Sequence, residues 1–166
     1  MSNSAFATIA VGTVVATVID LRTRRIPNEL TAAMAGIGVG LSAAGASGVP
    51  LWASIVGFVI GLALMMPGHV LGATGAGDVK LMAAIGAIVG PAMVVTTFLF
   101  TAVAGGVLAV AVAARRRRLS ATLAGTGRLV AGSSETRTLL HTAPAASRFA
   151  YGPAIAAGSI LAALVG

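Results

Sequence analysis

Long uncharged apolar segments recur along the chain, and the charged residues fall in the short stretches between them. The apolar segments cover residues 5–19, 30–48, 51–66, 81–114 and 150–165. An α-helix that crosses a bilayer needs about 20 mostly apolar residues, with about 17 to 25 as the usual range. The hydrophobic pattern therefore predicts a chain built from membrane-spanning helices.

The fourth apolar segment, residues 81–114, is too long for a single crossing. At about 1.5 Å per residue it would measure about 51 Å as one helix, whereas the hydrocarbon core of a bilayer is about 30 Å thick. Gly90 and Pro91 lie inside this segment, and a Gly-Pro pair favours a turn. We therefore expect two helices here, which brings the number of predicted spans to six.

The positions of the basic residues support this division and predict an orientation. With six spans, all 11 Lys and Arg residues fall in loops on one side: Arg22, Arg24, Arg25, Lys80, Arg115, Arg116, Arg117, Arg118, Arg128, Arg137 and Arg148. The loops on the other side, at residues 48–50 and 90–91, carry none. Basic loops normally face the cytoplasm. The prediction is an all-α, polytopic, six-helix protein of the cell (inner or plasma) membrane, with both termini outside the cytoplasm.

Composition agrees with a lipid environment and limits the classes of partner. Hydrophobic residues make up 57% of the chain and charged residues 9%, whereas a soluble domain has about 25% charged residues. The net charge of +7 does not indicate nucleic acid, because topology accounts for the arginines. We expect one integral-membrane domain over residues 1–166, with lipid as a partner. Residues 115–149, rich in Arg, Ser, Thr, Gly and Ala, predict a flexible basic cytoplasmic loop.

The candidate chemistry rests on oxygen, and above all on two aspartates. The chain has no cysteine and only two distant histidines, so we expect no metal site and no cofactor. Asp20 and Asp78 both lie at predicted cytoplasmic ends of spans. Ionisable groups at membrane depth are costly and commonly functional, although two helix-capping carboxylates in the headgroup region would be the simpler explanation.

Two neighbouring glycines and the paired carboxylates favour a hydrolytic site. Gly75 and Gly77 precede Asp78 and allow another segment to approach the backbone closely. One ionised carboxylate of a pair can take a proton from water while its protonated partner polarises a peptide carbonyl. Asp78 begins a predicted helix, where the helix dipole favours an anion, and Asp20 ends one. Our hypothesis from these positions is that Asp78 is the base and Asp20 the acid.

Three segments of the sequence resemble those of a known family. The stretch from Asp20 to Asn28 resembles the first active-site segment of the type IV prepilin leader peptidases, and the Gly-x-Gly-Asp stretch from Gly75 to Leu81 resembles the second. Residues 149–156 are similar to the Pro-Tyr-Gly-Pro segment that opens the last helix of the family, although Ala150 stands where proline is usual.

The resemblance implies an aspartic endopeptidase of the Gly-x-Gly-Asp kind, with Asp20 and Asp78 as its catalytic pair. The remaining motif residues would support the site: Pro27, Asn28, Gly75, Gly77, Lys80, Tyr151, Gly152 and Pro153. The implied partner is a prepilin or pseudopilin precursor of a type IV pilus system, whose short leader is removed at the cytoplasmic face. Because the chain has no Cys-x-x-Cys pair, it resembles the short peptidase-only forms of Tad and Flp pilus systems or the archaeal preflagellin peptidases.

Two other functions remain open at this point. A proton-coupled membrane carrier or assembly subunit could use Asp20 and Asp78 as a relay. A protease of the presenilin or signal-peptide-peptidase kind would carry its first aspartate after a tyrosine, whereas Ile19 precedes Asp20 here. The segment from Asp20 to Asn28 favours the leader peptidase, because a relay would not require it. The sequence predicts no particular oligomeric state.

Overall fold

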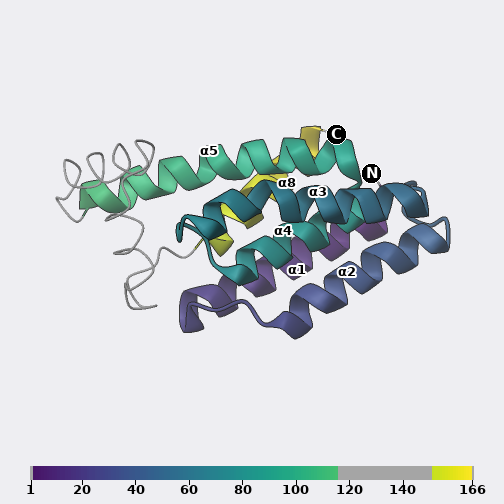
Figure 1. Ribbon diagram of the computed structural model, residues 1–166, viewed down its shortest axis with the longest axis horizontal. Helices are drawn as coiled ribbons and strands as arrows, with labels where there is room; N and C mark the ends of the chain where they lie inside the picture. Colours follow the sequence, from purple (N-terminus) through teal and green to yellow (C-terminus); the bar gives the residue numbers. More distant parts are fainter. Residues whose placement is uncertain (1, 116–150, 166) are drawn as a thin grey trace.

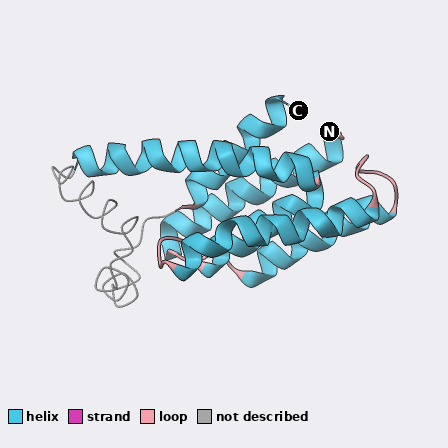
Figure 2. Ribbon diagram, turned by 45° about the horizontal axis from the view of Figure 1, so that its top comes forward, coloured by secondary structure: helices cyan, strands magenta, loops and turns pink. Residues whose placement is uncertain are grey.

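The structure, a computed structural model, describes residues 2–115 and 151–165. These residues form six α-helices and no strand (Figures 1 and 2). The helices are α1 (Asn3–Thr23), α2 (Asn28–Ala43), α3 (Leu51–Val70), α4 (Ala76–Val89), α5 (Pro91–Arg115) and α8 (Gly152–Val165). The predicted all-α class is therefore confirmed for the described part of the chain. Of the predicted basic loop, Arg115 ends α5 and residues 116–149 lie outside the described residues.

The division of the long apolar segment at Gly90 and Pro91 is confirmed. α4 ends at Val89, and Gly90 has a φ of 81°, a backbone conformation that residues with a Cβ rarely adopt. The Gly90 N–H still donates to Gly86 O at 2.9 Å, which closes the last turn of α4. Pro91 then begins α5, where its missing N–H costs nothing because the first N–H groups of a helix have no partner within that helix.

The predicted end of the third span, at Pro67 and Gly68, is wrong. α3 continues through both residues to Val70. Proline removes one hydrogen bond from a helix, but the following turn closes here because Leu71 N–H donates to Pro67 O and Ala73 N–H donates to Gly68 O. Proline near the end of a helix therefore does not by itself stop it.

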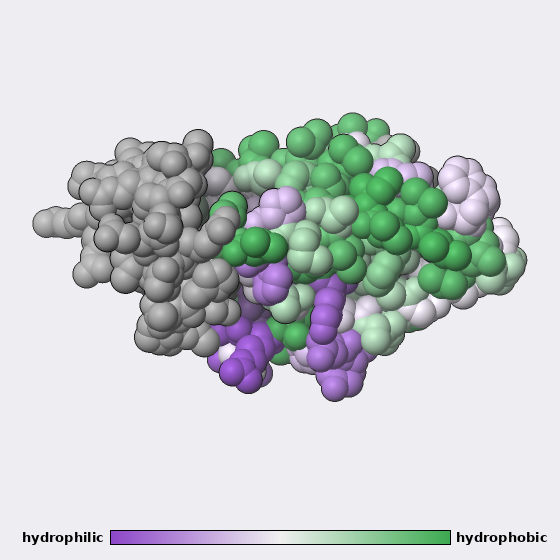
Figure 3. Space-filling view, viewed as in Figure 1, coloured by the Kyte–Doolittle hydropathy of each residue, from purple (hydrophilic) through white to green (hydrophobic). Residues whose placement is uncertain are grey.

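Three of the six helices are long and apolar enough to cross a membrane. They are α1, α3 and the Pro91–Val112 part of α5. α2 has 16 residues and α4 and α8 have 14 each, fewer than the usual minimum of about 17. The outer surface is apolar, with Val103 and Val107 each 66% exposed, and Figure 3 shows a broad hydrophobic face with hydrophilic residues along its lower edge. Apolar side chains over so much of the surface are typical of a membrane protein.

α4 forms the centre of the bundle. It packs against α3 and α2, while α8 lies between α1 and α5 (Figure 1). Four large side chains of α4 are completely buried: Leu81, Met82, Ile85 and Ile88. Helix α3 approaches especially closely, since a Cβ on either Gly57 or Gly86 would overlap the backbone of the other helix. Small residues permit such backbone contact between membrane helices.

Candidate active site

Asp20 and Asp78 line the same cavity, although 58 positions separate them in the sequence. Asp20 lies in the last turns of α1 and Asp78 in the first turn of α4, and their exposed fractions are 6% and 7%. The cavity has a volume of about 370 Å³. Its other lining residues are Arg24, Arg25, Ile26, Asn28, Ala73, Gly75, Ala76, Gly77 and Lys80. The two segments singled out by the sequence therefore meet at one end of the bundle.

Two hydrogen bonds with Gly75 hold Asp78 in place. The Gly75 N–H donates to Asp78 Oδ2 at 2.9 Å, and the Asp78 N–H donates to Gly75 O at 3.1 Å. A carboxylate at this position of the first turn satisfies an N–H that has no partner inside the helix. A Cβ on Gly75 would lie 3.2 Å from Asp78 Oδ2, so a larger residue would crowd the carboxylate. The first glycine of the Gly-x-Gly-Asp motif therefore leaves the space that the Asp78 carboxylate occupies.

The second glycine of this motif brings the two active-site segments together. A Cβ on Gly77 would lie only 2.9 Å from Ile26 Cβ and 3.3 Å from both Ile26 N and Ile26 O. The connection between α1 and α2 therefore lies directly on the first turn of α4, with Ile26 buried between them. A residue with a side chain at position 77 would separate these segments.

A third segment holds Asp20. The Gly152 N–H, at the start of α8, donates to Asp20 Oδ2 at 3.0 Å in a buried contact. A Cβ on Gly152 would lie 2.9 Å from the same oxygen and 3.1 Å from Asp20 Cβ. After Asp20, the chain turns at Arg24, whose φ of 55° is unusual for a residue with a side chain, and the Arg24 N–H donates to Asp20 O at 2.8 Å.

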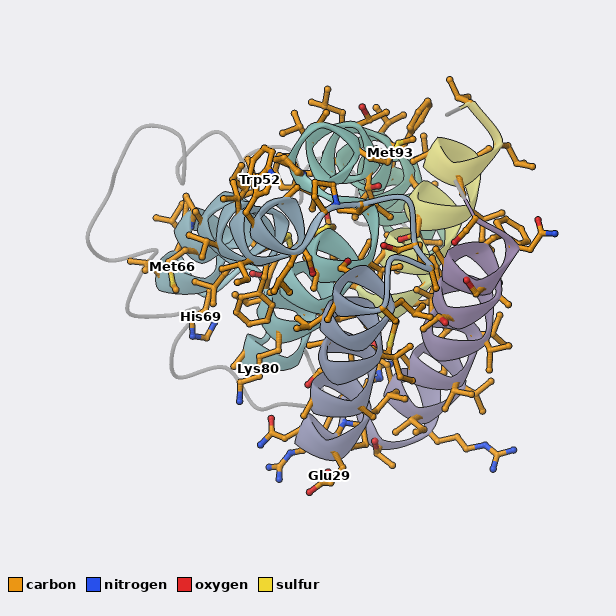
Figure 4. The ribbon with its side chains drawn as sticks, turned by 90° about the vertical axis from the view of Figure 1, so that its right-hand side faces the viewer. Glu29, Trp52, Met66, His69, Lys80 and Met93 are labelled. Carbon is orange, nitrogen blue, oxygen red and sulfur yellow. The ribbon has the colours of Figure 1, made fainter. Side chains whose placement is uncertain are left out.

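The other predicted site residues lie around this centre. Lys80 Nζ donates to Asn28 Oδ1 at 2.8 Å, which links the start of α2 to α4 at the cavity. Figure 4 shows Lys80 between His69 and Glu29 in that view. Pro27 lies directly before α2 as its N-cap residue. Tyr151 is half-buried before α8, and Pro153 lies in the first turn of that helix.

His69 lies in the last turn of α3. Its Nδ1 is 3.2 Å from Thr74 O, one residue before Gly75, so the ring ties the end of α3 to the loop that leads into α4. The sequence signals neither this contact nor the one between Ile26 and Gly77, because both depend on how separate helices pack.

Burial and the neighbouring charge of Asp78 raise the pKa of the Tyr151 hydroxyl, which lies directly before α8.

The side chains around the cavity determine which chemistry the site can support. The described residues include no group of three or more His, Asp or Glu side chains that could hold a metal ion. Two carboxylates in one cavity can share a proton and exchange it with a water molecule or a peptide. Arg24, Arg25 and Lys80 line the same cavity and make its surroundings cationic.

Comparison with models of known protein families gives a match. A family model described as the type IV leader peptidase family matches residues 7–110. The match contains both aspartates and the Gly75–Gly77 stretch, and it ends before the Tyr151 segment. Comparisons with curated proteins and with solved structures gave no match.

Proposed function

This chain belongs to the type IV leader peptidase family, and from that premise we propose that it is a membrane aspartic endopeptidase. Its substrates are prepilin or pseudopilin precursors, from which it removes the short N-terminal leader. The observation that carries this proposal is that Asp20 and Asp78 lie buried in one cavity. Each accepts a backbone N–H from a glycine, which fixes its orientation.

The two carboxylates divide the proton transfers of peptide hydrolysis. One carboxylate, ionised, takes a proton from water as the water oxygen attacks the carbonyl carbon, while the other, protonated, donates a hydrogen bond to the scissile carbonyl oxygen. When the C–N bond breaks, the leaving nitrogen receives a proton from the pair, and the products are a carboxylic acid and an amine. The place of Asp78 in the first turn of α4 favours it as the base and leaves Asp20, near the C-terminal end of α1, as the acid.

We place the cavity at the cytoplasmic end of six membrane-crossing helices. The basic residues Arg24, Arg25 and Lys80 gather at that end, as expected for the cytoplasmic side. Because the chain has no cysteine, single cysteines report topology directly. In intact cells, a membrane-impermeant maleimide should label Ala46→Cys, in the exposed loop between α2 and α3, but label Thr23→Cys only after permeabilisation. The opposite pattern would place the cavity outside the cell.

Co-expression with a tagged precursor tests the function itself. Wild type and Glu29→Gln, which alters an exposed carboxylate beside the cavity, should convert the precursor to a product that has lost its leader by mass. Asp20→Asn and Asp78→Asn should leave it uncut while remaining in the membrane at wild-type levels. Processing by both aspartate variants would eliminate the aspartic mechanism.

The carrier alternative receives no support from the described residues. Among them the acidic side chains Asp20, Glu29 and Asp78 all belong to helix ends near the cavity. A proton relay across a membrane needs titratable groups along its path.

A further inference from the structure

Helix α5 meets Tyr151, the residue directly before α8, at Gly105. This glycine is buried in α5, and a Cβ on it would lie 2.7 Å from Tyr151 Oη, 2.8 Å from Tyr151 Cε2 and 2.9 Å from Tyr151 Cζ. Real Cβ atoms do not approach other heavy atoms so closely. The outer end of the tyrosine ring therefore rests on the α5 backbone in space that only glycine leaves free.

Tyr151 in turn fixes the start of α8. Its carbonyl oxygen accepts hydrogen bonds from the Ala154 N–H at 3.0 Å and the Ile155 N–H at 3.1 Å, so Tyr151 is tied to the first turn of the helix. The next residue, Gly152, donates its N–H to Asp20 Oδ2. The amide that holds Asp20 therefore belongs to the peptide bond that joins Tyr151 to Gly152.

We propose that Gly105 is a positioning residue for the peptidase reaction. By seating the Tyr151 ring, it sets the start of α8 so that the Gly152 amide holds the Asp20 carboxylate in the cavity. The inference rests on the proposed function, in which Asp20 is catalytic. It adds a residue on α5 that belongs to none of the three segments carrying the family resemblance.

The neighbouring Gly106 provides a matched control. It lies in the same helix, it is exposed, and a Cβ on it would meet nothing within 4 Å. Replacing glycine by alanine should stabilise the helix to a similar extent at either position. A difference between Gly105→Ala and Gly106→Ala therefore reports the contact with Tyr151 rather than helix propensity.

The experiment compares these variants as purified protein cleaving a precursor, with kcat, KM and melting temperature measured for each. Displacing a catalytic group by about 1 Å can cost about 100-fold in rate, and the start of α8 should move by less. We expect Gly105→Ala to lower kcat about tenfold, with KM and melting temperature close to those of Gly106→Ala. Both glycine substitutions are repeated in a Tyr151→Ala background, where the ring is absent; there Gly105→Ala should lower kcat no more than Gly106→Ala does.

Two results would overturn the inference. One is a kcat of Gly105→Ala equal to that of Gly106→Ala, and the other is a loss from Gly105→Ala that is just as large in the Tyr151→Ala background. Asp20→Asn, measured in parallel, separates this inference from its premise. If Asp20→Asn cleaves like wild type, the proposed function fails; if it is inactive while both glycine variants are equally active, only the positioning role of Gly105 fails.

Discussion

The Gly77→Ala substitution tests whether contact between the two active-site segments sets the geometry of the aspartates. The added Cβ would lie 2.9 Å from Ile26 Cβ. Carbon atoms in contact prefer separations of about 3.5 to 4.0 Å, so the connection between α1 and α2 must retreat from α4 by about 0.6 Å or more. Asp20 precedes this connection and Asp78 adjoins Gly77. The retreat should therefore change the spacing of the two carboxylates.

A displacement of this size is large for a catalytic pair. Since a misplacement of about 1 Å can cost about 100-fold, we expect Gly77→Ala to lower kcat by about 10- to 100-fold. The assay is the rate of leader removal by purified protein, with product quantified by mass. Gly40→Ala is the matched control, because Gly40 lies in α2 and a Cβ there would meet nothing within 4 Å.

The control should cleave at close to the wild-type rate. The reasoning fails if Gly77→Ala, folded and present in equal amount, cleaves as fast as Gly40→Ala. It also fails if Gly77→Ala loses activity only because it no longer folds, so melting temperatures are measured alongside the rates.

Three further predictions concern protonation, a surface contact and a buried contact. The mechanism needs one protonated and one ionised carboxyl, so the cleavage rate should pass through a maximum and fall at both lower and higher pH; a rate that does not change with pH would contradict the carboxylate pair. Lys80→Met removes the exposed hydrogen bond to Asn28 and should lower the free energy of unfolding by no more than about 1 kcal/mol. Its melting temperature should therefore stay close to that of wild type, and failure to fold would refute this expectation. Ser54→Ala removes the buried 2.6 Å hydrogen bond to Ala87 O and should lower the free energy of unfolding by about 1 kcal/mol. The melting temperature should fall by a few degrees while cleavage is retained, and an unchanged melting temperature would show that this bond contributes little.

The sequence was most informative where local chemistry decides the structure. Gly90 and Pro91 divide the long apolar segment because one favours a positive φ and the other begins a helix readily, whatever surrounds them. Pro67 was misleading because the end of α3 depends on which carbonyls find partners in the next turn. The division at Gly90 and Pro91 also predicted a short α4, because the apolar segment begins at Leu81 and turns at Gly90, and α4 indeed has 14 residues.

For the site, the sequence identified the two aspartates but not what holds them. Their order and neighbouring motifs suggested that they meet, and the structure places both in one cavity. The Gly152 amide that binds Asp20 could not be predicted, because backbone N–H groups are present at almost every residue. The sequence also gave no sign that Gly105 differs from the other glycines among the 22 in the chain, because its role depends on the Tyr151 ring packed against it.

The most direct test of the central claim measures single-turnover cleavage by Asp20→Asn, Asp78→Asn and the double variant, each purified and shown to melt like wild type. Catalytic residues that act as one unit have non-additive effects. The account predicts that each single variant loses about 1,000-fold or more and that the double variant is no slower than the slower single variant. A single variant that cleaves within about tenfold of wild type, or losses that multiply in the double variant, would contradict a catalytic pair.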